Sequence, residues 1–274
     1  MALNPLKGRI EILAYTLFSV VYAVAGDTHA VWKGEEIWLD GKSYDRRPFA
    51  GSGALQREAK VYDVLGKHAR ITRCYGLHEL DSDSQVYALR LERAPKGSFR
   101  QYIINSEAPP MDDRLRMAAD FADGVQHLHE CGVTWGDISV RNSLLFDHFR
   151  VKLCDFGGAL LKGTDYEISQ TYETRYTPPG RDQDWEQISI MTREFFALGS
   201  AIYEITEWEV PYGTKATEEE VEDMLARKEL PKLSKGNPAG DIITRCWTGR
   251  CNSAQEVVHS LNQAVLQPIL RRRV

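Results

Sequence analysis

The sequence predicts an α+β protein of two lobes, a small β-rich N-terminal lobe with one main helix and a larger helical C-terminal lobe. Residues 10–50 are rich in Val, Ile, Tyr, Trp and Thr, which favour strands. Helical spacing of apolar residues dominates from about residue 112 onward. The 274 residues suffice for one large domain. We therefore expect a single domain over residues 1–274, with an N-lobe at about 10–92, a hinge at about 92–97 and a C-lobe at about 98–267.

The first strands of the N-lobe coincide with an apolar run from Ile12 to Ala25. Basic residues precede this run and Ala-Val-Ala ends it, so it also resembles a signal peptide with its cleavage site. However, Glu11 directly precedes the run, polar side chains interrupt it, and it is too short to span a membrane. Turn-forming pairs at Gly26-Asp27 and Asp40-Gly41 then divide the region as in an antiparallel sheet. We expect strands here, with a leader peptide as the alternative.

A helix is predicted over residues 53–65, because its apolar side chains share one face and Gly66 follows as a stop signal. Glu58 lies on that face too, and a carboxylate that points inward needs a cationic partner. Lys33, at the end of a predicted strand, is the natural candidate. Several alternatives remain open: Lys33 as an exposed hairpin residue, Lys42 in its place, and Glu35, Glu36 or Asp63 in place of Glu58.

The remaining elements follow from periodicity and end signals. Strands near 71–77 and 85–92 complete the N-lobe, and a short loop at 94–97 follows. The C-lobe is predicted to contain a helix over 112–130, short strands at 143–146 and 151–154, and a buried helix over 194–207. Two further helix starts are marked by capping-box spacing, Thr217 with Glu220 and Ser253 with Glu256.

Composition limits the class of function. The chain has 39 acidic and 34 basic residues, a net charge of −5, 43% hydrophobic residues and 27% charged residues. These values are ordinary for a globular protein and exclude a disordered tail, a collagen-like fibre and a small disulfide scaffold. Net negative charge argues against a dedicated nucleic-acid binder. We expect a monomer with no nucleic-acid or membrane partner.

The five cysteines form an odd, scattered set rather than a disulfide framework, which favours a reducing compartment and a cytoplasmic protein. Cys246 and Cys251 could form half of a metal site, but no second pair completes it. We expect two buried or unreactive thiols.

The most informative stretch is Trp135-Gly136-Asp137-Ile138-Ser139-Val140-Arg141-Asn142, between a predicted helix and a predicted strand. Asp155-Phe156-Gly157 begins thirteen residues after Asn142, at the end of the second short strand. Asp137 could accept a proton from a hydroxyl, and Asn142 and Asp155 offer the hard oxygen donors that suit Mg²⁺. Taken alone, Asp137 and Asn142 are also compatible with a solvated turn.

In this order, Lys33, Glu58, Asp137, Asn142 and Asp155 resemble the eukaryotic protein kinase family, whose pattern is a strand lysine, a helix glutamate, H-R-D-x-x-x-x-N and D-F-G. The likeness covers about residues 10–265, nearest to the divergent kinase-like proteins of fungi. It includes four further landmarks: Thr174 to Pro179, similar to the end of a kinase activation segment, Glu194 to Gly199, Cys246-Trp247 and Ser253-Ala254.

The resemblance implies a phosphotransferase that uses ATP and Mg²⁺ to phosphorylate a Ser, Thr or Tyr hydroxyl of a protein substrate. Lys33 would hold the α- and β-phosphates, fixed by Glu58, and Asp137 would deprotonate the hydroxyl. Asp155 would hold the Mg²⁺ that bridges the β- and γ-phosphates, and Asn142 would hold the second metal ion. The implied catalytic residues are Asp137, Lys33 and Asn142, and the implied nucleotide-binding residues are Lys33, Glu58, Leu91 as gatekeeper, Glu92, Ala94 and Asp155.

Several positions depart from the family pattern. The three glycines of the phosphate-covering loop fall on Ala14, Thr16 and Ser19, where backbone amides would approach phosphate less closely. Gly136 replaces the arginine of H-R-D, so we expect activity that does not require phosphorylation of residues 158–177. Within the loop, Trp135 replaces histidine, Ser139 replaces the lysine of Ser/Thr kinases, and Arg141 is the residue found in tyrosine kinases. Further along, Gly180 replaces the glutamate of A-P-E, and Cys251 lies near the position of the arginine that usually pairs with that glutamate.

These departures leave two alternatives to an active protein kinase. The first is a pseudokinase scaffold, favoured by the glycine-free loop and Gly136. The second is a small-molecule phosphotransferase, whose H-G-D-x-x-x-x-N loop the stretch at Trp135 resembles.

Overall fold

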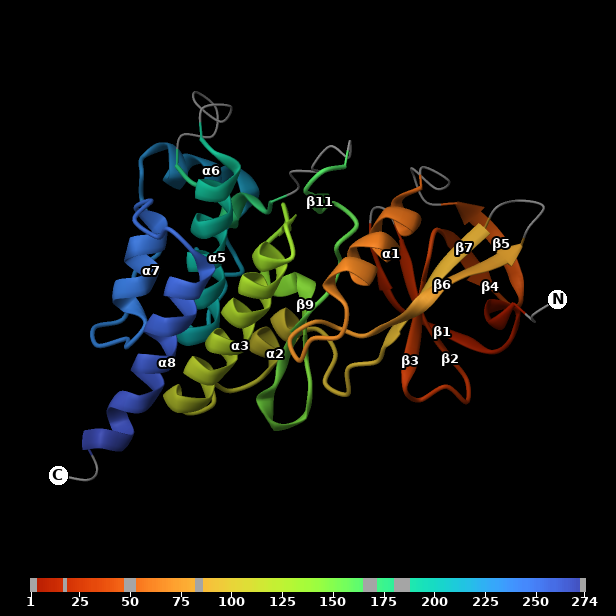
Figure 1. The fold of residues 1–274 in the computed structure, drawn as a ribbon, viewed down its shortest axis with the longest axis horizontal. Helices are drawn as coiled ribbons and strands as arrows, with labels where there is room; N and C mark the ends of the chain where they lie inside the picture. The colour runs from red at the N-terminus through yellow and green to blue at the C-terminus, as the bar shows by residue number, and fades with distance from the viewer. Residues whose placement is uncertain are drawn as a thin grey trace. The chain divides into compact units, whose positions relative to one another are not determined.

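The computed structural model describes residues 4–16, 19–46, 53–81, 86–164, 172–179 and 188–271 (Figure 1). The chain divides into two compact units. Unit 1 comprises Met1–His68 and Thr72–Ala94, and unit 2 comprises Ala69–Ile71 and Pro95–Val274. The first is rich in strands and the second in helices, as the α+β prediction requires. The boundary at Ala94 falls inside the predicted segment 92–97.

Unit 1 contains an antiparallel sheet in the order β1-β2-β3-β7-β6. Its strands are β1 (Ile10–Tyr15), β2 (Val20–Val24), β3 (Ala30–Gly34), β6 (Cys74–Asp81) and β7 (Val86–Glu92). The apolar run from Ile12 therefore lies largely in β1 and β2, as the strand interpretation predicts. Two further strands, β4 (Glu36–Leu39) and β5 (Lys42–Arg46), form a separate hairpin. The predicted single sheet over 10–50 is thus two sheets.

The hairpin packs on the main sheet through a buried cluster of aromatic and aliphatic residues. The Tyr22 hydroxyl donates to the Glu36 carbonyl at 2.7 Å and accepts from the Trp38 amide at 2.9 Å. These bonds satisfy polar groups that burial would otherwise leave unpaired. The buried members of this cluster are Leu6, Val20, Tyr22, Trp32, Trp38 and Ala88.

Helix α1 (Ala54–Leu65) packs against β6 and β7. Its buried side chains include Glu58 among the apolar ones, and Gly66 ends the helix at a φ of 62°, with its amide bonded to the Tyr62 carbonyl. This confirms the predicted helix. The strand predicted near 71–77 begins only at Cys74, and Ile71, which belongs to unit 2, forms an isolated bridge to Leu153 of the same unit.

Unit 2 is built around α5, whose residues are buried without interruption from Arg193 to Thr206. Helix α3 packs against α5 and α8, and α7 packs against α5 (Figure 1). The elements in chain order are α2 (Phe99–Asn105), α3 (Met111–Glu130), β8 (Val133–Thr134), β9 (Ser143–Leu145), β10 (Val151–Leu153), β11 (Leu160–Leu161), α5 (Ile190–Glu207), α6 (Glu218–Ala226), α7 (Gly240–Trp247) and α8 (Ala254–Arg271).

The helix starts of unit 2 largely follow the capping-box predictions. Thr217 and Glu220 form both reciprocal bonds at the start of α6. At α8, the Ser253 hydroxyl accepts from the Glu256 amide, but the Glu256 carboxylate accepts from the Asn252 amide. Helices α2 and α7 were not predicted, because short apolar segments are ambiguous between helix and strand. Among the described residues, no helix is both long and apolar enough to cross a membrane.

Candidate active site

Unit 1 joins two of the predicted residues in a buried ion pair. Lys33 extends from β3, and its Nζ lies 2.7 Å from Oε2 of Glu58 on α1. The side chains are 8% and 1% exposed. This confirms the predicted partnership, whereas Lys42 is exposed on β5. Lys33 and Glu58 therefore form a direct ion pair inside unit 1, which fixes the position of the Lys33 Nζ.

The other predicted residues of unit 1 lie at the end of β7. Leu91 is buried and lies opposite Val31 of the neighbouring strand β3. The carboxylate of Glu92 accepts from the Arg73 amide at 3.1 Å, and Ala94 is the last residue of the unit. A role of these residues in binding adenine stays a prediction.

The turn between β1 and β2 is closed by side chains where the family pattern has glycines. The Thr16 amide donates to the Ser19 carbonyl at 2.8 Å, and the Ser19 amide donates to the Thr16 hydroxyl at 2.8 Å. Both amides are therefore engaged within the turn. Of the other departures, Gly180 lies outside the described residues.

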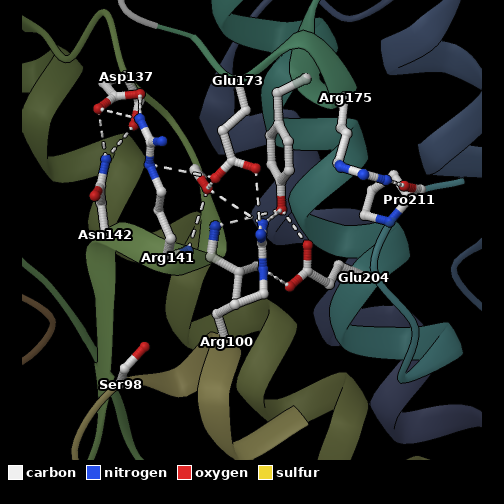
Figure 2. A network of polar contacts seen from close by, with 12 residues as sticks. Ser98, Arg100, Asp137, Arg141, Asn142, Glu173, Arg175, Glu204 and Pro211 are labelled. Carbon is white, nitrogen blue, oxygen red and sulfur yellow. Dashed lines mark hydrogen bonds and ion pairs between the residues drawn. The ribbon is translucent and has the colours of Figure 1, made fainter. Parts of the chain in front are cut away.

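Unit 2 brings Asp137 and Asn142 together at the two ends of one short loop. The Asn142 Nδ2 donates to Oδ2 of Asp137 at 2.8 Å and to its carbonyl oxygen at 2.9 Å. The Arg141 Nη2 donates to Oδ1 and Oδ2 of Asp137 at 2.9 and 3.0 Å (Figure 2). The Asp137 side chain is 17% exposed. Asp137 is thus held from two directions rather than being a solvated turn residue.

Burial raises the pKa of Asp137 to about 6, against the opposing effects of the Arg141 charge and of the Asn142 hydrogen bond. The negative charge of Asp155 also raises this pKa, so the two carboxylates act on each other. Asp155 itself has a φ of 61°, a conformation that is uncommon outside glycine. Its carbonyl accepts from the Trp135 Nε1 at 2.9 Å, which fixes the turn.

Trp135 takes over a structural role at the position of the family's histidine. Its ring is 1% exposed and lies 6.1 Å from the Phe121 ring and 5.6 Å from the Phe156 ring, between centroids. The indole therefore links α3, the loop at Asp137 and the Asp155-Phe156 turn. The departure from histidine thus places a larger ring in the interior, and its N–H group bonds the Asp155 carbonyl.

The loop backbone is anchored by the buried carboxylate of Glu194 on α5. This carboxylate accepts from the Trp135 amide at 3.2 Å, from the Gly136 amide at 2.8 Å and from the Tyr172 hydroxyl at 2.6 Å. Gly136 has a φ of 73°, in the left-handed region that favours glycine. The backbone conformation thus accounts for glycine at position 136, which the absence of the family's arginine alone does not explain.

A second polar network was missed by the sequence reasoning. Its centre is Arg100 on α2, which forms an ion pair with the fully buried Glu204 of α5. Arg100 also contacts Glu173 at 3.2 Å and the Tyr176 hydroxyl at 3.3 Å (Figure 2). Next to this network is a cavity of about 190 Å³, whose lining includes Arg100, Arg141, Glu173 and Arg175. Glu173 also accepts from the Ser139 hydroxyl at 2.8 Å, which ties residues 172–179 to the loop at Asp137.

The donor set fits a magnesium ion that is held partly by phosphate. Asn142 and Asp155 supply one amide and one carboxylate oxygen. Since the Asn142 nitrogen donates to Asp137, its oxygen lies on the other side of the amide. The described residues contain no cluster of three or more His, Cys, Asp or Glu side chains that could hold a metal. A site with one or two protein ligands plus substrate phosphates is what Mg²⁺ commonly uses.

The two C-terminal cysteines are buried thiols, as predicted. Cys246 and Cys251 are 1% and 6% exposed, and their sulfur atoms lie 2.8 Å apart. Both are free, and neither takes part in the site around Asp137.

Comparison with known proteins identifies the family. Residues 45–259 match the family described as protein tyrosine and serine/threonine kinase. The matched stretch starts after Lys33, so the place of Lys33 rests on its strand and its pair with Glu58.

Individual relatives agree with this match. Over 215 residues the chain is 30% identical to mitogen-activated protein kinase kinase kinase 20 of Arabidopsis thaliana, covering 72% of this chain and 61% of the relative. It is 29% identical over 194 residues to the tyrosine-protein kinase receptor svh-2 of Caenorhabditis elegans, covering 66% of this chain and 17% of the receptor. It is 28% identical over 169 residues to the serine/threonine/tyrosine-protein kinase HT1 of Arabidopsis thaliana, covering 60% and 43%.

The chain thus spans less than two thirds of each of these relatives. One of their names specifies tyrosine and another specifies serine, threonine and tyrosine, so the likeness does not select one acceptor hydroxyl. The match over most of the chain, together with a strand-rich unit followed by a helical one, establishes that the chain belongs to the protein tyrosine and serine/threonine kinase family.

Proposed function

We propose that this chain is an active cytoplasmic protein kinase, which transfers the γ-phosphoryl group of ATP to a hydroxyl of a protein substrate in the presence of Mg²⁺. The observation that supports this most is the placement of Asp137. Its carboxylate accepts hydrogen bonds from both Asn142 and Arg141, which orient it. The preceding residue, Gly136, is held by a hydrogen bond from its amide to Glu194. A scaffold alone has no need for a carboxylate held in this way.

Each residue has a part in this proposal. Asp137 accepts the proton of the substrate hydroxyl as the phosphate bond forms. Lys33, paired with Glu58, binds the phosphates, and Asn142 and Asp155 would hold magnesium. Bound Mg²⁺ would neutralise the charge that develops on the phosphate oxygens. Leu91, Glu92 and Ala94 contact the adenine.

A protein substrate is favoured over a small metabolite by residues 172–179. This segment is fixed in unit 2 by the buried hydroxyls of Tyr172 and Tyr176, which donate to Glu194 and Glu204. It also borders the 190 Å³ cavity beside Arg141, where a substrate side chain could enter. A small metabolite does not require such a surface next to the proton acceptor.

A pseudokinase is the alternative that one observation favours. In the β1–β2 turn, the Thr16 amide donates to the Ser19 carbonyl and the Ser19 amide donates to the Thr16 hydroxyl. Such amides are less available to bind phosphate, and nucleotide affinity would fall accordingly.

The test compares the wild type with Asp137→Asn and Asp155→Asn in ATP, Mg²⁺ and a mixed peptide library that contains Ser, Thr and Tyr. We expect transfer by the wild type, a loss of at least about 100-fold in both variants, and unchanged thermal unfolding. Asp147→Asn is the matched control, because Asp147 is an exposed aspartate of the same unit. We expect it to retain wild-type activity.

The outcomes separate the candidates. Nucleotide binding without transfer would support the pseudokinase, and transfer only to an aminoglycoside- or choline-like metabolite would support the small-molecule enzyme. A wild-type rate in Asp155→Asn would remove Asp155 from the metal site. Phosphatase-treated protein is a further arm, in which we expect activity to persist, because the Tyr172 hydroxyl is buried against Glu194 and Thr174 is buried as well.

A further inference from the structure

Glu173 is placed where the 172–179 segment meets the loop that carries Asp137. Its side chain is 14% exposed. One carboxylate oxygen accepts from the Ser139 hydroxyl at 2.8 Å and lies 3.3 Å from the Arg141 Nε. The other accepts from the Arg100 Nη1 at 3.2 Å. One carboxylate therefore contacts three side chains, and two of them belong to the loop.

Arg141 connects Glu173 to Asp137. Its Nη2 binds both oxygens of Asp137, while its Nε faces Glu173, so one guanidinium lies between two carboxylates (Figure 2). Arg141 is 42% exposed. A long side chain at such a position loses considerable rotamer freedom when it is fixed, and a second anchor keeps it in the geometry that Asp137 requires.

Glu173 is itself fastened to the interior of unit 2. Arg100, which binds it, forms an ion pair with Glu204, and Glu204 also accepts from the Tyr176 hydroxyl at 2.7 Å. Glu204 and Tyr176 are both fully buried. The chain of contacts from α5 to Asp137 thus consists of ion pairs and charge-assisted hydrogen bonds.

We propose that Glu173 is a positioning residue of the phosphoryl transfer, which acts through Arg141 to hold Asp137 in the orientation that accepts the substrate proton. This inference rests on the proposed function of Asp137. The physical reason is that proton transfer needs the acceptor within hydrogen-bond reach, and a displacement of about 1 Å can cost on the order of 100-fold in rate.

The simpler view is that Glu173 only ties residues 172–179 to the unit. Both views predict that removing it is harmful, so a single substitution does not separate them. They differ in what happens when Arg141 is also removed. A residue that acts through Arg141 has little left to lose in that background, whereas a separate structural tie has the same effect in both backgrounds.

The experiment is a double-mutant cycle of Glu173→Gln and Arg141→Gln, with kcat and KM measured in ATP, Mg²⁺ and the best peptide of the library. We expect Glu173→Gln to lower kcat about tenfold with KM for the peptide changed by less than about twofold. In the Arg141→Gln background, the same change should lower kcat by less than about twofold. Glu219→Gln, an exposed carboxylate on α6, is the matched control and should leave kcat unchanged.

The same cycle is run with Glu173→Asp, which keeps the charge on a shorter side chain and should lose less kcat than Glu173→Gln. Thermal unfolding reports which variants fold, and the cycle with Asp decides the question if Gln does not fold. An unchanged kcat in the single variants, or an equal loss with and without Arg141, would overturn the role of Glu173 while leaving the kinase activity standing. No transfer by the wild type would overturn both proposals.

Discussion

The two units hold their buried glutamates in different ways. In unit 1, Glu58 faces Lys33 across the contact between one helix and one strand. In unit 2, Glu204 shares Arg100 with Glu173 and Tyr176, and Glu173 leads on to the loop at Asp137. The Lys33–Glu58 contact is a direct ion pair between two side chains, whereas the Arg100–Glu204 ion pair shares its arginine with Glu173 and Tyr176. The two arrangements should therefore respond differently to paired substitutions.

The largest effect is expected from Glu58→Ala in unit 1. This change leaves the buried Lys33 ammonium without its carboxylate, so the free energy of unfolding should fall by about 3 kcal/mol. The double variant Lys33→Met with Glu58→Leu should recover most of this loss, because buried ion pairs can often be replaced by apolar side chains. Urea denaturation measures the loss in the single variant and the recovery in the double variant, and hydrogen exchange of the α1 and β3 amides reports the local effect.

Glu79→Ala is the matched control, since Glu79 is exposed on β6, and it should change stability by less than about 0.5 kcal/mol. The double variant should still lack phosphoryl transfer, which would separate the role of the pair in stability from its role in catalysis. A double variant as unstable as Glu58→Ala would show that Lys33 and Glu58 do not form a separable pair.

A smaller effect is expected from Arg100→Met in the network, about 2 kcal/mol at pH 8. Burial already raises the pKa of Glu204 to about 7, and losing the Arg100 charge raises it further. Glu204 can then take up a proton, which limits the cost. Because the folded form binds this proton more tightly than the unfolded form, the destabilisation should diminish as the pH falls from 8 to 6.

Here the paired substitution should not help. Arg100→Met with Glu204→Leu removes both members of the ion pair, yet it also deprives Glu173 and Tyr176 of a partner. We expect the double variant to be no more stable than Arg100→Met. Full recovery, measured by the same denaturation at pH 8, would mean that the network behaves as a simple pair and that the contrast between the units is wrong.

This contrast also explains what could be predicted from the sequence. Glu58 was found because it interrupts the apolar face of a well-defined helix, and Lys33 ends a strand that the composition marks clearly. The same reasoning applied to Glu204, inside an apolar helix, would have demanded a cation. That cation is Arg100, 104 positions away in the sequence and on the short helix α2, which no periodicity revealed.

The contacts of Glu173 could not be predicted from the sequence for a different reason. Residues 172–179 form no long regular element, only a short turn at Thr174–Tyr176, so no face or register places the Glu173 side chain. By contrast, Asp137 and Asn142 could be placed together because both lie in one loop of fixed length. Spacing within a loop or an element is readable from the sequence, whereas contacts between irregular segments depend on the complete tertiary structure.

The smallest effect is expected at Gly136, whose importance the sequence suggested for a side-chain reason and the structure supports for a backbone reason. With a φ of 73°, an L-residue here is strained, so Gly136→Ala should lower the free energy of unfolding by about 1 kcal/mol. Gly240→Ala is the matched control in the same unit, because Gly240 begins α7 without a positive φ, and it should be neutral or slightly stabilising.

Gly136→Arg, which restores the family's arginine, should be at least as unstable as Gly136→Ala, since it meets the same backbone strain. If Gly136→Ala were as stable as the wild type, the left-handed backbone would not be the reason for glycine, and the missing arginine would again be the better explanation.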